Sequence, residues 1–128
     1  MRFAMLIYET PEAFASRAHN DPEPYRAAWR LYHEAMTAAG VDVGGDPLDL
    51  PHTGATVRVT DGKRHVRDGP YADTKEQSAG VAILELPSLE EAIAWATPPS
   101  VWGGTLSLAF PATPPVRRPR WRPRWRPR

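Results

Sequence analysis

The chain contains no cysteine, which excludes a disulfide framework, a thiolate nucleophile and a zinc site built on sulfur. It has no apolar run close to the ~20 residues of a membrane span, and the first apolar segment meets Glu9 after six positions, too few for a signal peptide. We therefore expect a soluble, cytoplasmic protein with no membrane partner. Its 128 residues, 41% hydrophobic and 24% charged, are typical of one globular domain.

Basic residues are scarce over most of the chain. The last twelve residues hold seven of the 16 lysines and arginines, whereas all 15 acidic residues come before Val116. Residues 1–116 therefore carry nine basic and fifteen acidic side chains, a net charge of −6. Nucleic-acid binding needs a basic surface, so nucleic acid is an expected partner only through residues 117–128.

Hydrophobic periodicity predicts four strands of a sheet, each short and bounded by turn residues. They cover residues 3–8, 41–45, 81–86 and 105–110. The first and third of these strands present apolar side chains on both faces, which is typical of buried strands. We expect Gly44 and Gly45 to end the second strand.

Two helices are predicted from capping signals and from apolar residues that recur every three or four positions. The pair Asp21–Pro22 supplies an N-cap and a first-turn proline for a helix that ends at Gly40. Ser88 and Glu91 form a capping box that begins a second helix, and this helix cannot pass Pro98.

A hairpin is inserted between the second and third strands. Residues 56–60 and 64–67 are its arms, and Asp61–Gly62 is the preferred pair for a two-residue turn. The element order predicts an α+β fold, a ferredoxin-like βαββαβ sheet with an inserted β-hairpin. Two helices cover only one face of such a sheet, so the strands that are apolar on both faces need a second cover. We therefore expect a homodimer that packs sheet to sheet.

Residues 1–110 are expected to form this domain, and residues 111–128 a disordered tail rich in proline, arginine and tryptophan. The tetrapeptide Arg-Pro-Arg-Trp occurs at 118–121 and again at 122–125, and prolines at every fourth position forbid a helix. We interpret the tail as functionally incidental, the product of a shifted reading frame through repetitive DNA. The alternative is binding of a polyanion through arginine contacts and tryptophan stacking.

The segment Asp68–Gln77 reads DGPYADTKEQ and closely resembles the hallmark motif of the DGPF branch of the YCII-related proteins. Two further segments, GGDPL at residues 44–48 and LPSLEEA at residues 86–92, strengthen the resemblance. It covers roughly residues 1–96, after which the chain departs from the pattern. The resemblance implies a dimeric α+β barrel.

The specific function of this family is undefined. Some proteins of the wider superfamily carry out lyase, isomerase or dehalogenation steps on small aromatic or lactone-like molecules without a metal or cofactor. The resemblance therefore implies an enzyme that performs proton-transfer chemistry on a small molecule. The alternative is a non-catalytic ligand-binding or regulatory protein associated with transcription.

The loop from Arg67 to Glu76 concentrates charged side chains around a Gly-Pro turn. A carboxylate beside a lysine can act as a general base, and constrained loops often carry such groups. We predict Asp68 and Asp73 as catalytic residues, with Lys75 as their electrostatic partner. The alternative is a turn whose charges are solvated.

The first helix supplies the other candidates. Its aromatic stripe of Tyr25, Trp29 and Tyr32 either lines a pocket for a ring-shaped ligand or packs in the core. His33 lies beside the stripe and is a possible acid or base at the pocket edge. In a shorter YCII-like branch a helix histidine acts with an aspartate, but counting back from Gly40 puts that position at Trp29, so we expect no such pair. The predicted ligand-binding residues are Trp29, Tyr32, His33, Pro70, Tyr71, Thr74 and Glu76.

The four histidines, at positions 19, 33, 52 and 65, lack the spacing that places two metal ligands on one helical face. The chain also lacks a glycine-rich phosphate loop and a nucleophile elbow. We therefore expect neither a metal site nor a cofactor.

Overall fold

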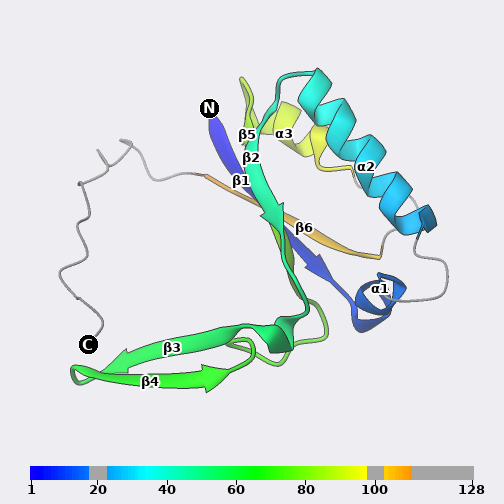
Figure 1. Cartoon of the computed structure of the whole chain (residues 1–128). Coiled ribbons are helices and arrows are strands. Elements are labelled where there is room, and N and C mark those ends of the chain that lie inside the picture. The colour runs from blue at the N-terminus through cyan, green and yellow to red at the C-terminus, as the bar shows by residue number, and fades with distance from the viewer. Residues whose placement is uncertain (18–22, 98–102, 111–128) are drawn as a thin grey trace, which may run out of the picture.

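The computed structural model describes residues 1–17, 23–97 and 103–110 (Figure 1). Its elements are β1 (Arg2–Glu9), α1 (Pro11–Ser16), α2 (Glu23–Ala38), β2 (Asp42–Pro47), the 3-10 helix η1 (Pro51–Thr53), β3 (Ala55–Thr60), β4 (Lys63–Asp68), β5 (Gln77–Glu85), α3 (Leu89–Trp95) and β6 (Gly104–Ala109). Within these ranges no helix has the length and apolar character to cross a membrane. The predicted cap Asp21–Pro22 and the predicted tail 111–128 lie outside the described residues.

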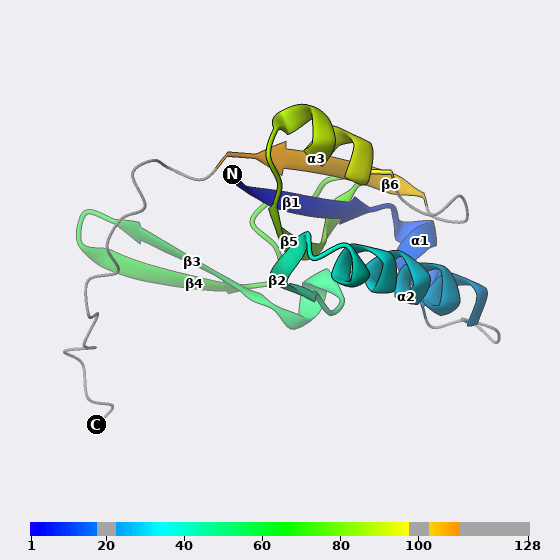
Figure 2. The same ribbon diagram turned by 90° about the horizontal axis from the view of Figure 1, so that it is seen from above.

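Four strands form one antiparallel sheet in the order β2-β5-β1-β6. The chain skips one strand position twice, since α1 and α2 connect β1 to β2 and α3 connects β5 to β6. In Figure 2, α2 lies on the β2 side of the sheet and α3 on the β6 side. This arrangement is ferredoxin-like, and the predicted α+β fold is confirmed.

The inserted hairpin forms a separate two-stranded sheet of β3 and β4. Asp61 and Gly62 form its turn with φ angles of 51° and 73°, which is the turn geometry that matches the strand twist and favours these two residues. Figure 1 shows the hairpin extending away from the main sheet on the side opposite α2 and α3. The predicted hairpin is therefore present, as a projection from the main sheet.

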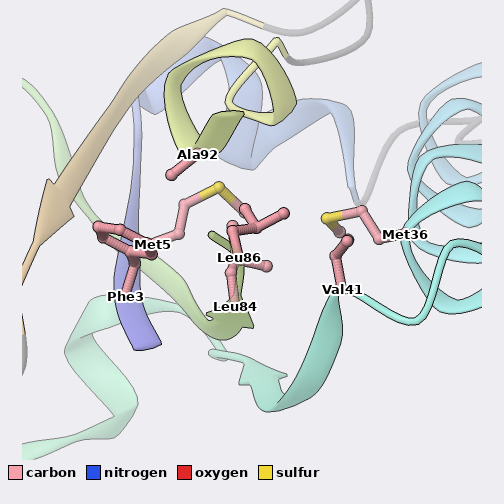
Figure 3. Close-up of a cluster of buried hydrophobic side chains, with 7 residues drawn as sticks. All are labelled: Phe3, Met5, Met36, Val41, Leu84, Leu86 and Ala92. Carbon is pink, nitrogen blue, oxygen red and sulfur yellow. The ribbon is translucent and has the colours of Figure 1, made fainter. Parts of the chain in front are cut away.

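The core lies between the sheet and the helices. Odd-numbered residues of β1 face the helices, so Phe3 and Met5 are buried, with 1% and 0% of their surfaces exposed. Figure 3 shows the buried cluster, which consists of Phe3, Met5, Met36, Val41, Leu84, Leu86 and Ala92. Burial of each large apolar side chain contributes about 1.5–3 kcal/mol, so this cluster holds α2 and α3 on the sheet.

The prediction from the sequence lacked one helix and placed two strand ends incorrectly. The prediction of only two helices is wrong, because α1 forms directly after β1: Pro11 occupies its first turn and the Thr10 hydroxyl accepts from the amide of Ala13 at 3.2 Å. The prediction that Gly44 and Gly45 end the second strand is also wrong, because β2 continues to Pro47. The third strand, β5, begins at Gln77, four residues earlier than expected.

Candidate functional site

A cavity of about 730 Å³ lies between α2 and the sheet. Its walls are mainly apolar and aromatic: Tyr25, Trp29 and Tyr32 come from α2, and Met5 and Ile7 come from β1. A volume of this order and an apolar lining with a few polar groups are typical of small-molecule sites. The cavity therefore suits a small ligand that contains a ring.

The aromatic wall follows from the spacing of α2, since residues three and four apart lie on one helical face. The ring of Trp29 lies 6.4 Å from that of Tyr25 and 5.7 Å, edge to face, from that of Tyr32. The Tyr32 hydroxyl donates to the Trp95 carbonyl at 2.5 Å, which ties α2 to the end of α3. Burial raises the pKa of Tyr32 to about 12, so its phenol stays protonated at neutral pH.

A buried carboxylate, that of Glu9, lies at one end of the cavity. The side chain has 0% exposure, and its Oε2 accepts from Nε of Arg17 at 3.0 Å and lies 2.7 Å from Nη2 of the same residue. The Arg17 guanidinium also donates to the carbonyls of Leu48 at 2.7 Å and Ala79 at 3.3 Å. The arginine compensates the carboxylate charge, as burial of a charge requires.

Tyr25 extends this pair. Its hydroxyl donates to Oε1 of Glu9 and lies 3.3 Å from Nε of Arg17. Burial, and then the hydrogen bond and negative charge of Glu9, raise the pKa of Tyr25 to about 12. The phenol is therefore a protonated donor at neutral pH, and the three side chains form a connected polar network.

A β-bulge shapes the other end of the cavity. The pairing of β2 with β5 shifts register between Asp42 and Gly44, and the amide of Gly44 donates to Oδ1 of Asp42 at 3.1 Å. The second carboxylate oxygen, Oδ2, lies 2.9 Å from Nε2 of His33 on α2. The bulge therefore orients the Asp42 carboxylate toward the helix, a role that bulges often have near functional sites.

The strand next to the bulge needs glycine at position 45. This residue has a φ of 141°, which L side chains rarely adopt, and a Cβ placed there would lie 2.2 Å from the carbonyl oxygen of Val81. Backbone of β2 and β5 can approach this closely only without a side chain. The GG pair in the sequence thus marks the strand that positions Asp42, although it was predicted to end that strand.

The pair of His33 and Asp42 corrects the expectation that no histidine–aspartate pair forms. Counting back from Gly40 had put the histidine position of the pair at Trp29, and His33 lies one helical turn beyond it. Its side chain is 66% exposed and that of Asp42 10%, and both line the cavity. When Nε2–H is donated to the carboxylate, a neutral imidazole presents Nδ1 as a proton acceptor.

The predicted loop residues lie elsewhere. Asp68 and Asp73 line a second cavity of about 480 Å³, together with Pro70 and Tyr71. Arg67 crosses the loop and donates to the carbonyls of Pro70 and Tyr71, each at 2.9 Å. Both aspartates are exposed, so this cavity is an open polar depression on the loop.

The ten predicted site residues therefore fall into three groups. Trp29, Tyr32 and His33 line the cavity at α2, and Asp68, Pro70, Tyr71 and Asp73 line the one at the loop. Thr74, Lys75 and Glu76 line neither cavity. The loop carboxylates and the helix aromatics therefore do not share a cavity within the described residues of one chain.

Four of the cavity residues that make these polar contacts were not predicted as site residues. These are Glu9, Arg17, Tyr25 and Asp42, of which Tyr25 had been placed only in the aromatic stripe. Alternation along β1 could have flagged Glu9, because it puts an acidic residue on the same face as Phe3 and Met5. No local signal pairs it with Arg17. Among the described residues, no group of three or more histidine, aspartate or glutamate side chains is placed to hold a metal ion.

The strand order and the separate hairpin place the chain in the class of ferredoxin-like α+β domains with an inserted hairpin. The model of the YCII-related domain matches residues 1–104, and the chain therefore belongs to the YCII-related family. An uncharacterised protein of Rhizobium meliloti (strain 1021) is 45% identical over 97 residues, which are 75% of this chain and 77% of that protein. The resemblance inferred from the sequence is confirmed at the level of the family.

Proposed function

We propose that this YCII-related protein is a cofactor-free enzyme that transfers a proton on a small aromatic or lactone-like molecule, bound in the cavity between α2 and the sheet. The observation that carries the proposal is the 2.9 Å contact between His33 and Asp42 at the wall of that cavity. A histidine oriented by a carboxylate, with its second nitrogen open to the ligand, is a common general base.

The rest of the cavity supports this role. The aromatic wall offers faces for a ring, and the hydrogen-bonded network of Tyr25, Glu9 and Arg17 lies at the opposite end. Tyr25 and His33 are eight residues apart, which is about 12 Å along the helix axis. A single aromatic ring is shorter than this distance, so a ring that contacts His33 lies against the aromatic wall and does not reach Tyr25.

The experiment measures hydrogen–deuterium exchange in D₂O by NMR, with phenylpyruvate and simple lactones as small molecules that carry an acidic C–H. We expect accelerated exchange with the protein, a loss of at least about a hundredfold in His33→Asn, and a smaller loss in Asp42→Asn, since general-base catalysis contributes about 10²–10⁴-fold. His65→Asn, on the exposed hairpin and outside both cavities, is the matched control and should exchange normally. Unchanged exchange in His33→Asn would contradict the proposal.

A second candidate function is a non-catalytic ligand-binding or regulatory protein associated with transcription. The apolar cavity favours ligand binding in either case. If some of these compounds bind but none shows accelerated exchange, the result would favour this second function over the first.

The catalytic assignment of Asp68, Asp73 and Lys75 remains a separate proposal. It is supported by the position of both aspartates on the second cavity, near His52. Asp68→Asn combined with Asp73→Asn should reduce exchange if this cavity is the reaction site, and should leave it unchanged if His33 is the base. The DGPY motif at residues 68–71 also leads us to propose membership of the DGPF branch.

We also propose that the protein is a homodimer. Even-numbered residues of β1, such as Leu6 and Tyr8, lie on the sheet face away from α2 and α3, next to Val81 and Ile83 of β5. The hairpin extends on that same side of the sheet, as Figure 1 shows. A second copy would cover both surfaces. Light scattering that gives a monomer mass at all concentrations would refute this.

A further inference from the structure

One edge of α2 places basic side chains along the cavity. Arg26, Arg30 and His33 all line it, and their spacing of four and three residues puts them on one side of the helix. Arg26 and Arg30 are exposed, whereas Trp29, which lies between them in the sequence, is partly buried and lines the cavity. The cavity therefore has an aromatic interior and a basic rim.

Two of the three carboxylates that line the cavity already have a hydrogen-bonding partner. Glu9 is paired with Arg17, and Asp42 with His33. Among the described residues Arg26 has no salt bridge, and that of Arg30 is an exposed contact of 3.5 Å with Glu23. Such an exposed pair contributes little, so a ligand can replace it at small cost.

We propose that the cavity binds a small aromatic carboxylate, whose carboxylate is held by Arg26 and Arg30 while its ring lies against Trp29. This inference rests on the proposed function for its cavity and adds the ligand class. The planar guanidinium offers paired N–H donors that match the two oxygens of a carboxylate, and charge-assisted bonds of this kind are the strong ones. Asp46 lies across the cavity on β2, so an anion is favoured on the α2 side.

The position of the two arginines also determines which part of the ligand can give a proton to His33. Arg30 is three residues from His33, so a carboxylate held there keeps the adjoining part of the ligand beside the imidazole. The C–H bond breaks, an N–H bond forms at Nδ1, and the electron pair passes into the adjoining carbonyl or ring. The imidazolium then returns the proton to another atom of the ligand, so no oxidant or reductant is needed.

The test compares an acid with its neutral amide, 3-phenylpropionate with 3-phenylpropionamide, by titration calorimetry on the full chain. We expect the acid to bind at least about tenfold more tightly, since hydrogen bonds to charged groups contribute about 1.5–3 kcal/mol. Arg26→Gln with Arg30→Gln should remove the preference. Arg64→Gln, on the hairpin and outside both cavities, is the matched control and should keep it.

Equal binding of acid and amide, or a preference that survives in the double variant, would overturn the inference. If circular dichroism shows that the double variant does not fold, the test uses the salt dependence of the wild-type preference for the acid. That preference must shrink when NaCl is raised from 0.02 to 0.5 M, about the range over which exposed charges become screened. A preference unaffected by salt would also overturn it. The proposed function fails separately, through unchanged exchange in His33→Asn.

Discussion

The two cavities differ in how their polar side chains are held. At α2, Glu9 and Asp42 are buried or nearly so, and each contacts a side chain outside its own strand. Asp68, which ends β4 and begins the DGPY motif, and Asp73, on the loop that follows, are both exposed. The motif on which the sequence resemblance rested therefore lies in one region, and the most constrained polar groups lie in another.

This difference shows why a recognisable motif does not by itself locate the chemistry. A Gly-Pro loop is easily read in a sequence because its residues are adjacent. A reaction needs groups held within hydrogen-bond reach of a ligand, and burial with several partners provides that. The predictions below change one region and use the other as the reference.

The largest effect is expected from Arg17→Met. This substitution removes the Arg17 guanidinium from the buried Glu9 carboxylate and removes the contacts to Leu48 and Ala79. The loss of one partner of a buried ion pair costs about 3–5 kcal/mol. We expect a lower free energy of unfolding by that amount in urea denaturation. Arg64→Met, on the exposed hairpin, should change it by about 0.5 kcal/mol or less, and equal losses in both variants would contradict the comparison.

A smaller loss is expected from Gly45→Ala. The added Cβ would lie 2.2 Å from the Val81 carbonyl oxygen, on a residue with φ of 141°, so β2 must move away from β5. Overpacking of this kind costs about 1–3 kcal/mol. The bulge that orients Asp42 should shift with it, and the imidazole NMR signals of His33 report that change. Gly54→Ala is the control, because its Cβ would meet only ordinary contact at 3.6 Å. Unperturbed His33 signals in Gly45→Ala would show that the bulge does not position this pair.

Much of the fold was predictable because its signals are local. Hydrophobic periodicity located the sheet strands, and the capping residue Ser88 located the start of α3. Asp61–Gly62 fixed the hairpin turn. The short helix α1 was missed even though Thr10 and Pro11 form a usable start signal, because its six residues are too few to show periodicity.

The site was less predictable because its contacts join distant residues. Glu9 meets Arg17 and Tyr25 only after α1 and α2 fold back onto β1. Asp42 reaches His33 through a bulge that depends on pairing between β2 and β5, and no spacing rule encodes that pairing. The aromatic stripe was visible from its helical period, but the period does not distinguish a pocket wall from core packing.

A still smaller effect is expected at alkaline pH. The folded protein holds the pKa of Tyr25 at about 12, against an ordinary value of 10.0. The folded state therefore binds more protons than the unfolded state between about pH 10 and 12. The contribution is present below pH 10 and is lost as the pH rises to about 12. Urea denaturation at several alkaline pH values should show this fall, and Tyr25→Phe should show a shallower one. Identical slopes would mean that Tyr25 does not titrate with folding.

The smallest effect on the unfolding of a single chain is expected on the hairpin. Val57 and Val66 are paired neighbours on one face of β3 and β4, with 57% and 59% of their surfaces exposed. Threonine at both positions keeps a β-branched side chain, so the variant should lose about 0.5 kcal/mol or less as a monomer. If the hairpin packs on a second copy, the same change should raise the dimer dissociation constant in sedimentation equilibrium, because buried methyl groups are lost. Lys63→Thr, on the other face of the hairpin, is the control. A dissociation constant that is unchanged in the valine variant would place the dimer contact away from this hairpin face.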